Sequence, residues 1–89
     1  MSTDDDSLLQ FPCAFPIKAM GLADADFDAL VVQIIQRHVG DLAEGAVRSK
    51  LSRGGKYMSV TVTITARSRN QLDAIYRDLS GHQRVVMAL

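Results

Sequence analysis

The segment that most restricts the fold is residues 56–66, which read KYMSVTVTITA. After the first lysine, hydroxyl-bearing residues alternate without exception with the apolar residues Met58, Val60, Val62, Ile64 and Ala66. A period of two places the two sets on opposite faces of a β-strand. This segment is therefore predicted to bury one face, whereas its threonine-rich face is left for water or a polar partner.

A second, more polar strand is predicted over residues 45–53, immediately before this one. Gly54-Gly55 is a pair typical of a two-residue hairpin turn, because both residues accept positive φ angles. The preceding strand has Val47 and Leu51 on one face and cations on the other. Such a polar composition is typical of a strand at the edge of a sheet.

Two segments have the spacing of amphipathic helices. In residues 24–38, apolar side chains recur every three or four positions, Asp24 or Asp26 is expected to cap the start, and Gly40 is expected to end the helix. In residues 68–80, Ser68 and Gln71 fit a capping box. Gly81 follows this second helix as its expected stop.

Two further strands complete the pattern, over residues 14–20, ended by Gly21, and residues 85–89. The order strand–helix–strand–strand–helix–strand predicts an α+β, ferredoxin-like βαββαβ sandwich. Its four-stranded antiparallel sheet should carry both helices on one face, with the first and third strands central. The residues expected to share its core are Phe15, Ile17, Phe27, Leu30, Val31, Ile34, Met58, Val60, Val62, Ile64, Leu72, Ile75 and Leu79.

The chain length of 89 residues limits the protein to one small domain. We expect residues 1–9 to form a flexible leader and residues 10–89 to form the domain. The leader is acidic where a signal peptide would be basic, and no apolar run approaches the roughly 18 residues of a membrane span. These features favour a cytoplasmic protein that does not enter a membrane.

Ten basic and ten acidic residues cancel over the chain, but they are unevenly distributed. Four cations lie within residues 48–56, with no acid among them. The predicted docking surface for a protein partner or a small anionic metabolite comprises Lys18, Arg48, Lys50, Arg53, Lys56, Tyr57 and Ser59. A weak RNA or nucleotide site on the 48–56 hairpin is the alternative, and cations on an edge strand also deter aggregation without any partner.

No residue is assigned a catalytic or metal-binding role, and no cofactor is expected. Cys13, His38 and His82 lack the spacing of a zinc site or of a nucleophile with its base. Asp73 and Asp78 are interpreted as part of a solvated helix face. An enzyme with an unrecognised site is the remaining alternative, and a weak homodimer through the open sheet face or a sheet edge is expected.

Five strings carry a family resemblance: FPCAFPIKAMG, QRH at 36–38, GGKYMSVTVTITA, QLDAIYRDL and VVMAL. In order and spacing they resemble the YbeD-like family of small bacterial cytoplasmic proteins, from about Leu8 to Leu89. The resemblance implies a ferredoxin-like fold similar to ACT domains and a non-enzymatic regulatory or interaction role. It also implies an association with lipoate metabolism, and it carries over no catalytic residue.

Overall fold

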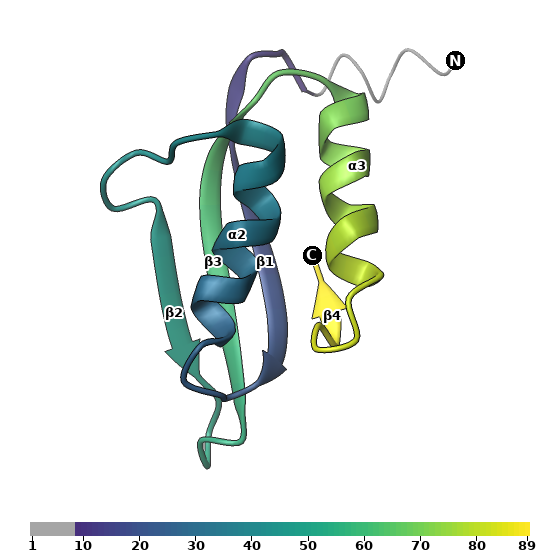
Figure 1. Ribbon diagram of the computed structural model, residues 1–89. Helices are drawn as coiled ribbons and strands as arrows, with labels where there is room; N and C mark the ends of the chain where they lie inside the picture. Colours follow the sequence, from purple (N-terminus) through teal and green to yellow (C-terminus); the bar gives the residue numbers. More distant parts are fainter. Residues whose placement is uncertain (1–8) are drawn as a thin grey trace.

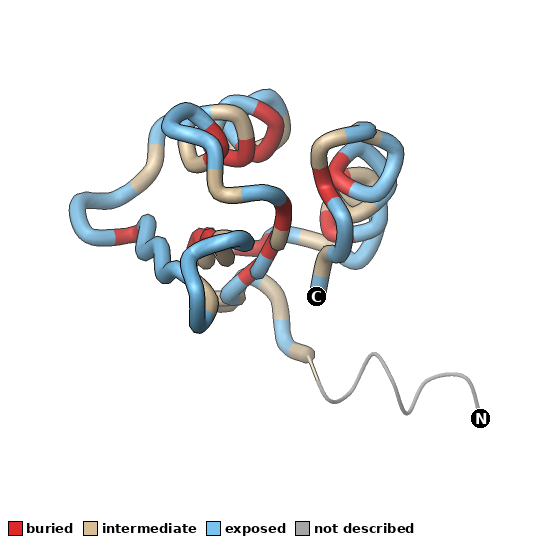
Figure 2. The backbone as a smooth tube through the Cα atoms, turned by 90° about the horizontal axis from the view of Figure 1, so that it is seen from below, coloured by how far each residue is buried: buried red, intermediate tan, exposed pale blue. Residues whose placement is uncertain are grey.

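Four antiparallel strands form one sheet in the order β2-β3-β1-β4 in the computed structural model, which describes residues 9–89 (Figure 1). Both helices lie on the same side of this sheet (Figure 2). The predicted ferredoxin-like α+β class and the central positions of the first and third strands are confirmed. In chain order the elements are β1 Cys13–Leu22, α2 Phe27–Val39, β2 Val47–Leu51, β3 Tyr57–Ala66, α3 Arg69–Ser80 and β4 Met87–Ala88.

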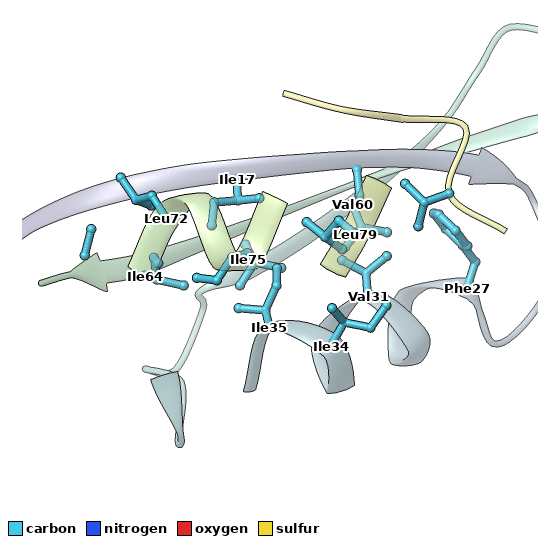
Figure 3. Packing of buried hydrophobic residues seen from close by; sticks show 14 residues of the cluster. Ile17, Phe27, Val31, Ile34, Ile35, Val60, Ile64, Leu72, Ile75 and Leu79 are labelled. Carbon is cyan, nitrogen blue, oxygen red and sulfur yellow. The ribbon is translucent and has the colours of Figure 1, made fainter. Parts of the chain in front are cut away.

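The core lies between the helices and the two central strands (Figure 3). The alternation in β3 is confirmed, because its residues from Val60 to Ala66 are buried at every second position. Phe15, Leu30 and Met58 are only half-buried, unlike the other predicted core residues. The core also contains Ala19, Ile35, Ala46 and Val85, which were not among the predicted core residues, and Ala66, whose burial the alternation in β3 did predict.

Gly21 does not end β1, contrary to the prediction, but lies inside the strand one residue before its end. A Cβ atom built at Gly21 would lie 2.5 Å from both the Phe27 ring and the Arg84 carbonyl oxygen. The residue is buried. The glycine is therefore required for a close approach of three chain segments, and not as a strand terminator.

The hairpin between β2 and β3 is longer than the predicted two-residue turn. The Ser52 amide donates a hydrogen bond to the Tyr57 carbonyl, and residues 53–56 form the loop between them. Ser52 Oγ also accepts from the Tyr57 amide at 3.0 Å. Gly54 and Gly55 have φ angles of 88° and 77°, so the requirement for glycine is confirmed although the turn length is wrong.

β4 is much shorter than the strand predicted over residues 85–89. The chain leading into β4 does not keep the regular antiparallel register with β1. Val86 donates its amide hydrogen to the Met20 carbonyl, although Met20 is aligned with Met87. Lys18 and Leu89 then exchange two backbone hydrogen bonds at 3.0 and 2.7 Å. β4 therefore covers only part of the outer edge of β1.

The helix ends follow the predictions only in part. Asp26 occupies the N-cap position of α2 without a side-chain cap bond, whereas Gly40 ends that helix with a φ of 74°. Ser68 caps α3 as predicted, since its Oγ accepts from the Gln71 amide at 3.1 Å. The Gln71 side chain, however, accepts from the amide of Arg67 rather than that of Ser68, so the reciprocal bond of the capping box is shifted.

Residues 1–8 of the predicted leader lie outside the described part of the chain. Leu9 is half-buried against the core. Within the described residues, neither helix has the length and apolar character that crossing a membrane requires.

Candidate docking surface

The sheet face opposite the helices brings together most of the predicted docking residues. Strand register aligns Lys18 with Thr61 and Thr61 with Arg48, so these residues form one row across three strands. The neighbouring row contains Met20, Ser59 and Lys50. Aligned residues of antiparallel strands share a face, and the intervening residues of β1 and β3 are the buried ones. Both rows therefore face away from the helices.

Tyr57 extends this surface toward the end of the sheet, where it is aligned with Leu22. The Lys56 ammonium nitrogen lies 5.5 Å from the centroid of the Tyr57 ring, within the range of a cation–π contact. Lys56 and Arg53 belong to the hairpin loop and not to a strand. The seven predicted residues thus divide into five on the open face and two at its end.

Two shallow pockets lie on either side of the cationic rows. One, of about 240 Å³, is lined by Met20, Lys50, Arg53, Tyr57 and Ser59, among others. The other, of about 450 Å³, includes Arg48, Thr61 and Thr63 together with Glu44 from the loop before β2. Both pockets are open to solvent, so they can bind the side chains of a partner more readily than they can enclose a small molecule.

The part of the same face toward β4 is apolar, which the sequence analysis missed. Met20 is aligned with Met87, and Lys18 pairs with Leu89. Met87 and Leu89 are 49% and 62% exposed. The open face therefore changes from apolar at β4 to cationic at β2. The Met20–Met87 alignment could not be inferred from the two segments separately.

No acidic residue occurs among the outward-facing positions of the four strands. Asp24 and Asp26, just beyond the end of β1, are paired with Arg84, whose guanidinium lies 2.8 Å from Asp26 Oδ1 and 3.4 Å from Asp24 Oδ2. The hydrogen bond from Arg84 holds the pKa of Asp26 below its ordinary value. Among residues 9–89, Glu44 borders the pocket that contains Arg48, but no carboxylate occupies the outward-facing strand positions beside the cations.

The side chains considered for catalysis make local contacts in the structure. His38 Nε2 lies 2.6 Å from Asp78 Oδ2, so Asp78 is not simply the solvated residue that was predicted. His82 lies in a turn, as expected, and its Nδ1 accepts from the Arg84 amide at 3.1 Å. Cys13 is half-buried at the start of β1. Within residues 9–89 no three His, Cys, Asp or Glu side chains are grouped so that they could hold a metal ion.

The fold and its helix-free face define a ferredoxin-like α+β domain with an amphiphilic sheet surface. The chain belongs to the family described as "Protein of unknown function (DUF493)", whose model matches residues 6–89. The resemblance to YbeD-like proteins is thereby confirmed.

Relatives of similar size share almost the whole chain. A UPF0250 protein of Chromobacterium violaceum is 44% identical over the full length of both chains, and one of Paraburkholderia phytofirmans is 42% identical, also over the full length of both. A UPF0250 protein of Azotobacter vinelandii is 46% identical over 91% of this chain and 89% of its own.

The solution structure of protein HP0495 from H. pylori has the same fold. It superposes with a TM-score of 0.67 at 14% sequence identity, covering 91% of this chain and 85% of that chain. At this level of identity the likeness concerns the fold alone.

Proposed function

We propose that this protein is a non-enzymatic interaction module that binds an acidic protein surface on the open face of its sheet. The observation that supports this most directly is the arrangement of Lys18 and Arg48 on either side of Thr61, with Lys50 in the adjacent row. Three exposed cations thus face one direction without a carboxylate among the outward-facing strand residues.

The chemistry of this face suits a protein partner. Thr61 is aligned between Lys18 and Arg48, and Ser59 lies beside Lys50. The hydroxyl groups of both residues can donate to or accept from a partner's polar groups. The apolar side chains of Met20 and Met87 supply area whose burial favours association. Because the charges are exposed, they should mainly govern the association rate and the choice of partner, and salt should weaken binding.

We further propose that docking has a regulatory effect on the partner. By resemblance to ACT domains, docking would control the partner's activity, and the family resemblance directs the search for that partner to enzymes of lipoate metabolism. A small anionic metabolite would contact the same cations. RNA is a weaker fit, because Ser59, Thr61 and Thr63 stand on the open face of the central strand where aromatic side chains would stack on bases.

The test compares two charge reversals of equal size. Arg48→Glu/Lys50→Glu alters the open face, whereas Arg37→Glu/Arg77→Glu alters exposed helix positions by the same net charge. A fluorescent polyglutamate peptide serves as the probe, with anisotropy measured at low and high salt. We expect the first variant to lose at least about tenfold in affinity and the second to change by less than about threefold.

Equal losses in both variants would show that net charge alone attracts the probe, and would overturn the proposal. Tighter binding of a single-stranded RNA than of polyglutamate would also overturn it in favour of the nucleic-acid alternative. Native mass spectrometry of the protein purified without a tag would show a co-purified small anion, the outcome expected for a metabolite site.

A further inference from the structure

Within residues 9–89, the outer edge of β2 has no neighbouring strand, because β2 stands at the end of the sheet order. The Ser52 amide donates a hydrogen bond to the Tyr57 carbonyl, and the Thr63 amide donates one to the Ala46 carbonyl. The even-numbered residues of this segment therefore direct their backbone groups toward β3. In an antiparallel ladder the alternate residues direct their backbone groups the other way. The amides and carbonyls of Val47, Ser49 and Leu51 therefore point outward from the sheet.

In the described part of the chain, the helix side of β2 is also left largely exposed. Val47 and Leu51 are aligned with Val62 and Met58 on the side of the sheet that carries the helices, yet they are 37% and 55% exposed. β2 stands at one margin of the molecule beyond α2, which packs against β1 and β3 (Figure 1). The edge thus presents backbone donors and acceptors, apolar side chains on one side, and Arg48 and Lys50 on the other.

We propose that β2 binds an extended segment of a partner protein by strand addition, and that this segment alternates acidic and apolar residues. Its backbone would pair with Val47, Ser49 and Leu51, as in other cases where a peptide extends a sheet. Its acidic side chains would lie beside Arg48 and Lys50, and its apolar side chains would cover Val47 and Leu51. The inference rests on the proposed function, since it specifies how the acidic partner docks.

A second copy of this chain is a poor occupant of the same edge. Antiparallel pairing of two β2 strands about Ser49 would place Val47 opposite Leu51 favourably, but Arg48 of one copy would lie opposite Lys50 of the other. Moving the register by two residues places Arg48 opposite Arg48 or Lys50 opposite Lys50. Like charges directly opposite each other destabilise a strand pair, so an acidic strand is favoured over a second copy.

The test compares three synthetic peptides. The first alternates valine and glutamate, and the second has the same composition in two blocks. The third is the alternating peptide with methyl groups on the backbone amide nitrogens that would face β2. We expect the alternating peptide to bind at least about tenfold more tightly than the other two, because only it offers both the pattern and the backbone donors. N-methylation tests the backbone pairing without altering the protein.

On the protein side, Ser49→Pro removes an outward amide while the ladder to β3 keeps its donors, and Ser49→Thr is the matched control. Ser49→Pro should abolish the preference for the alternating peptide, whereas Ser49→Thr should retain it. Thermal melting establishes that each variant is folded; should Ser49→Pro not fold, the N-methylated peptide decides.

If N-methylation has no effect while Arg48→Glu/Lys50→Glu still loses binding, strand addition is wrong and the proposed acidic docking stands. If neither change has an effect, both are wrong. A dimer of the free protein that Ser49→Pro dissociates in sedimentation experiments would show that β2 pairs with a second copy, and would overturn the choice of an acidic strand.

Discussion

His38, in the last turn of α2, is joined to Asp78, in the last turn of α3, by a contact of 2.6 Å between His38 Nε2 and Asp78 Oδ2. The same end of α2 is held a second time, because Gln71 donates from Nε2 to the His38 carbonyl at 3.2 Å. The two helices are thus tied by polar contacts on their outer side as well as by the apolar core beneath them. His38 and Asp78, two side chain types that often serve in catalysis, thus contribute here to the contact between the helices.

Removing this bridge should have a small, measurable effect. We expect a double-mutant cycle of His38→Ala and Asp78→Ala to give a coupling free energy of about 0.2–1 kcal/mol, the range of partly exposed pairs. Chemical denaturation measures it. The control cycle pairs His38→Ala with Asp73→Ala, for which no coupling is expected; equal coupling in both cycles would contradict the specific contact.

The buried face of β3 should dominate stability over its open face. Ile64→Ala removes a side chain that is 4% exposed and should lower the free energy of unfolding by about 2–5 kcal/mol. Thr63→Ala, one residue away on the open face, should change it by roughly 0.5 kcal/mol or less. Urea denaturation of both variants tests the register, and a larger loss for Thr63→Ala would contradict it.

Gly21 should not tolerate even one added methyl group. Its Cβ would lie 2.5 Å from the Phe27 ring and the Arg84 carbonyl oxygen, so Gly21→Ala should cost about 1–3 kcal/mol through displaced packing. Gly81→Ala is the control, because φ there is −80° and the nearest atom to an added Cβ, the Arg77 carbonyl oxygen in the last turn of α3, is 3.1 Å away rather than 2.5 Å. Thermal melting should show the larger decrease for Gly21→Ala, and similar decreases would remove the steric argument.

Periodicity sufficed to predict the elements, because burial of a sheet face and a helix stripe repeats locally in the sequence. The sheet order then followed from the order of the elements along the chain. The alternation from Met58 to Ala66 is the clearest case. Features that depend on two distant segments were missed or misplaced. Gly21 was interpreted as a strand end because nothing near it in sequence indicates that the distant Arg84 carbonyl oxygen lies against it.

The candidate surface shows the same limit. Alternation alone placed Arg48 and Lys50 on one face of their strand, and the register with Thr61 and Ser59 fits that placement. The apolar part of the surface depends on how β4 aligns with β1, which no local pattern specifies. Arg84 was overlooked for the same reason, since its partners Asp24 and Asp26 lie about 60 residues earlier in the chain.

The Arg84–Asp26 pair should make stability depend on pH in the acidic range. Hydrogen bonding and charge attraction from Arg84 lower the pKa of Asp26 below its ordinary value of 3.8 in the folded protein. A carboxyl with a lowered folded pKa contributes stability that is fully present above the unfolded pKa. That contribution is lost as the pH falls through the folded pKa.

Arg84→Gln should therefore raise the pKa of Asp26 toward 3.8, measured by NMR titration of its side-chain carboxyl. The stability difference between wild type and variant should be present at neutral pH and shrink below about pH 4, because protonated Asp26 gains nothing from the guanidinium. A pKa of Asp26 that stays unchanged in Arg84→Gln would show that Arg84 does not set it.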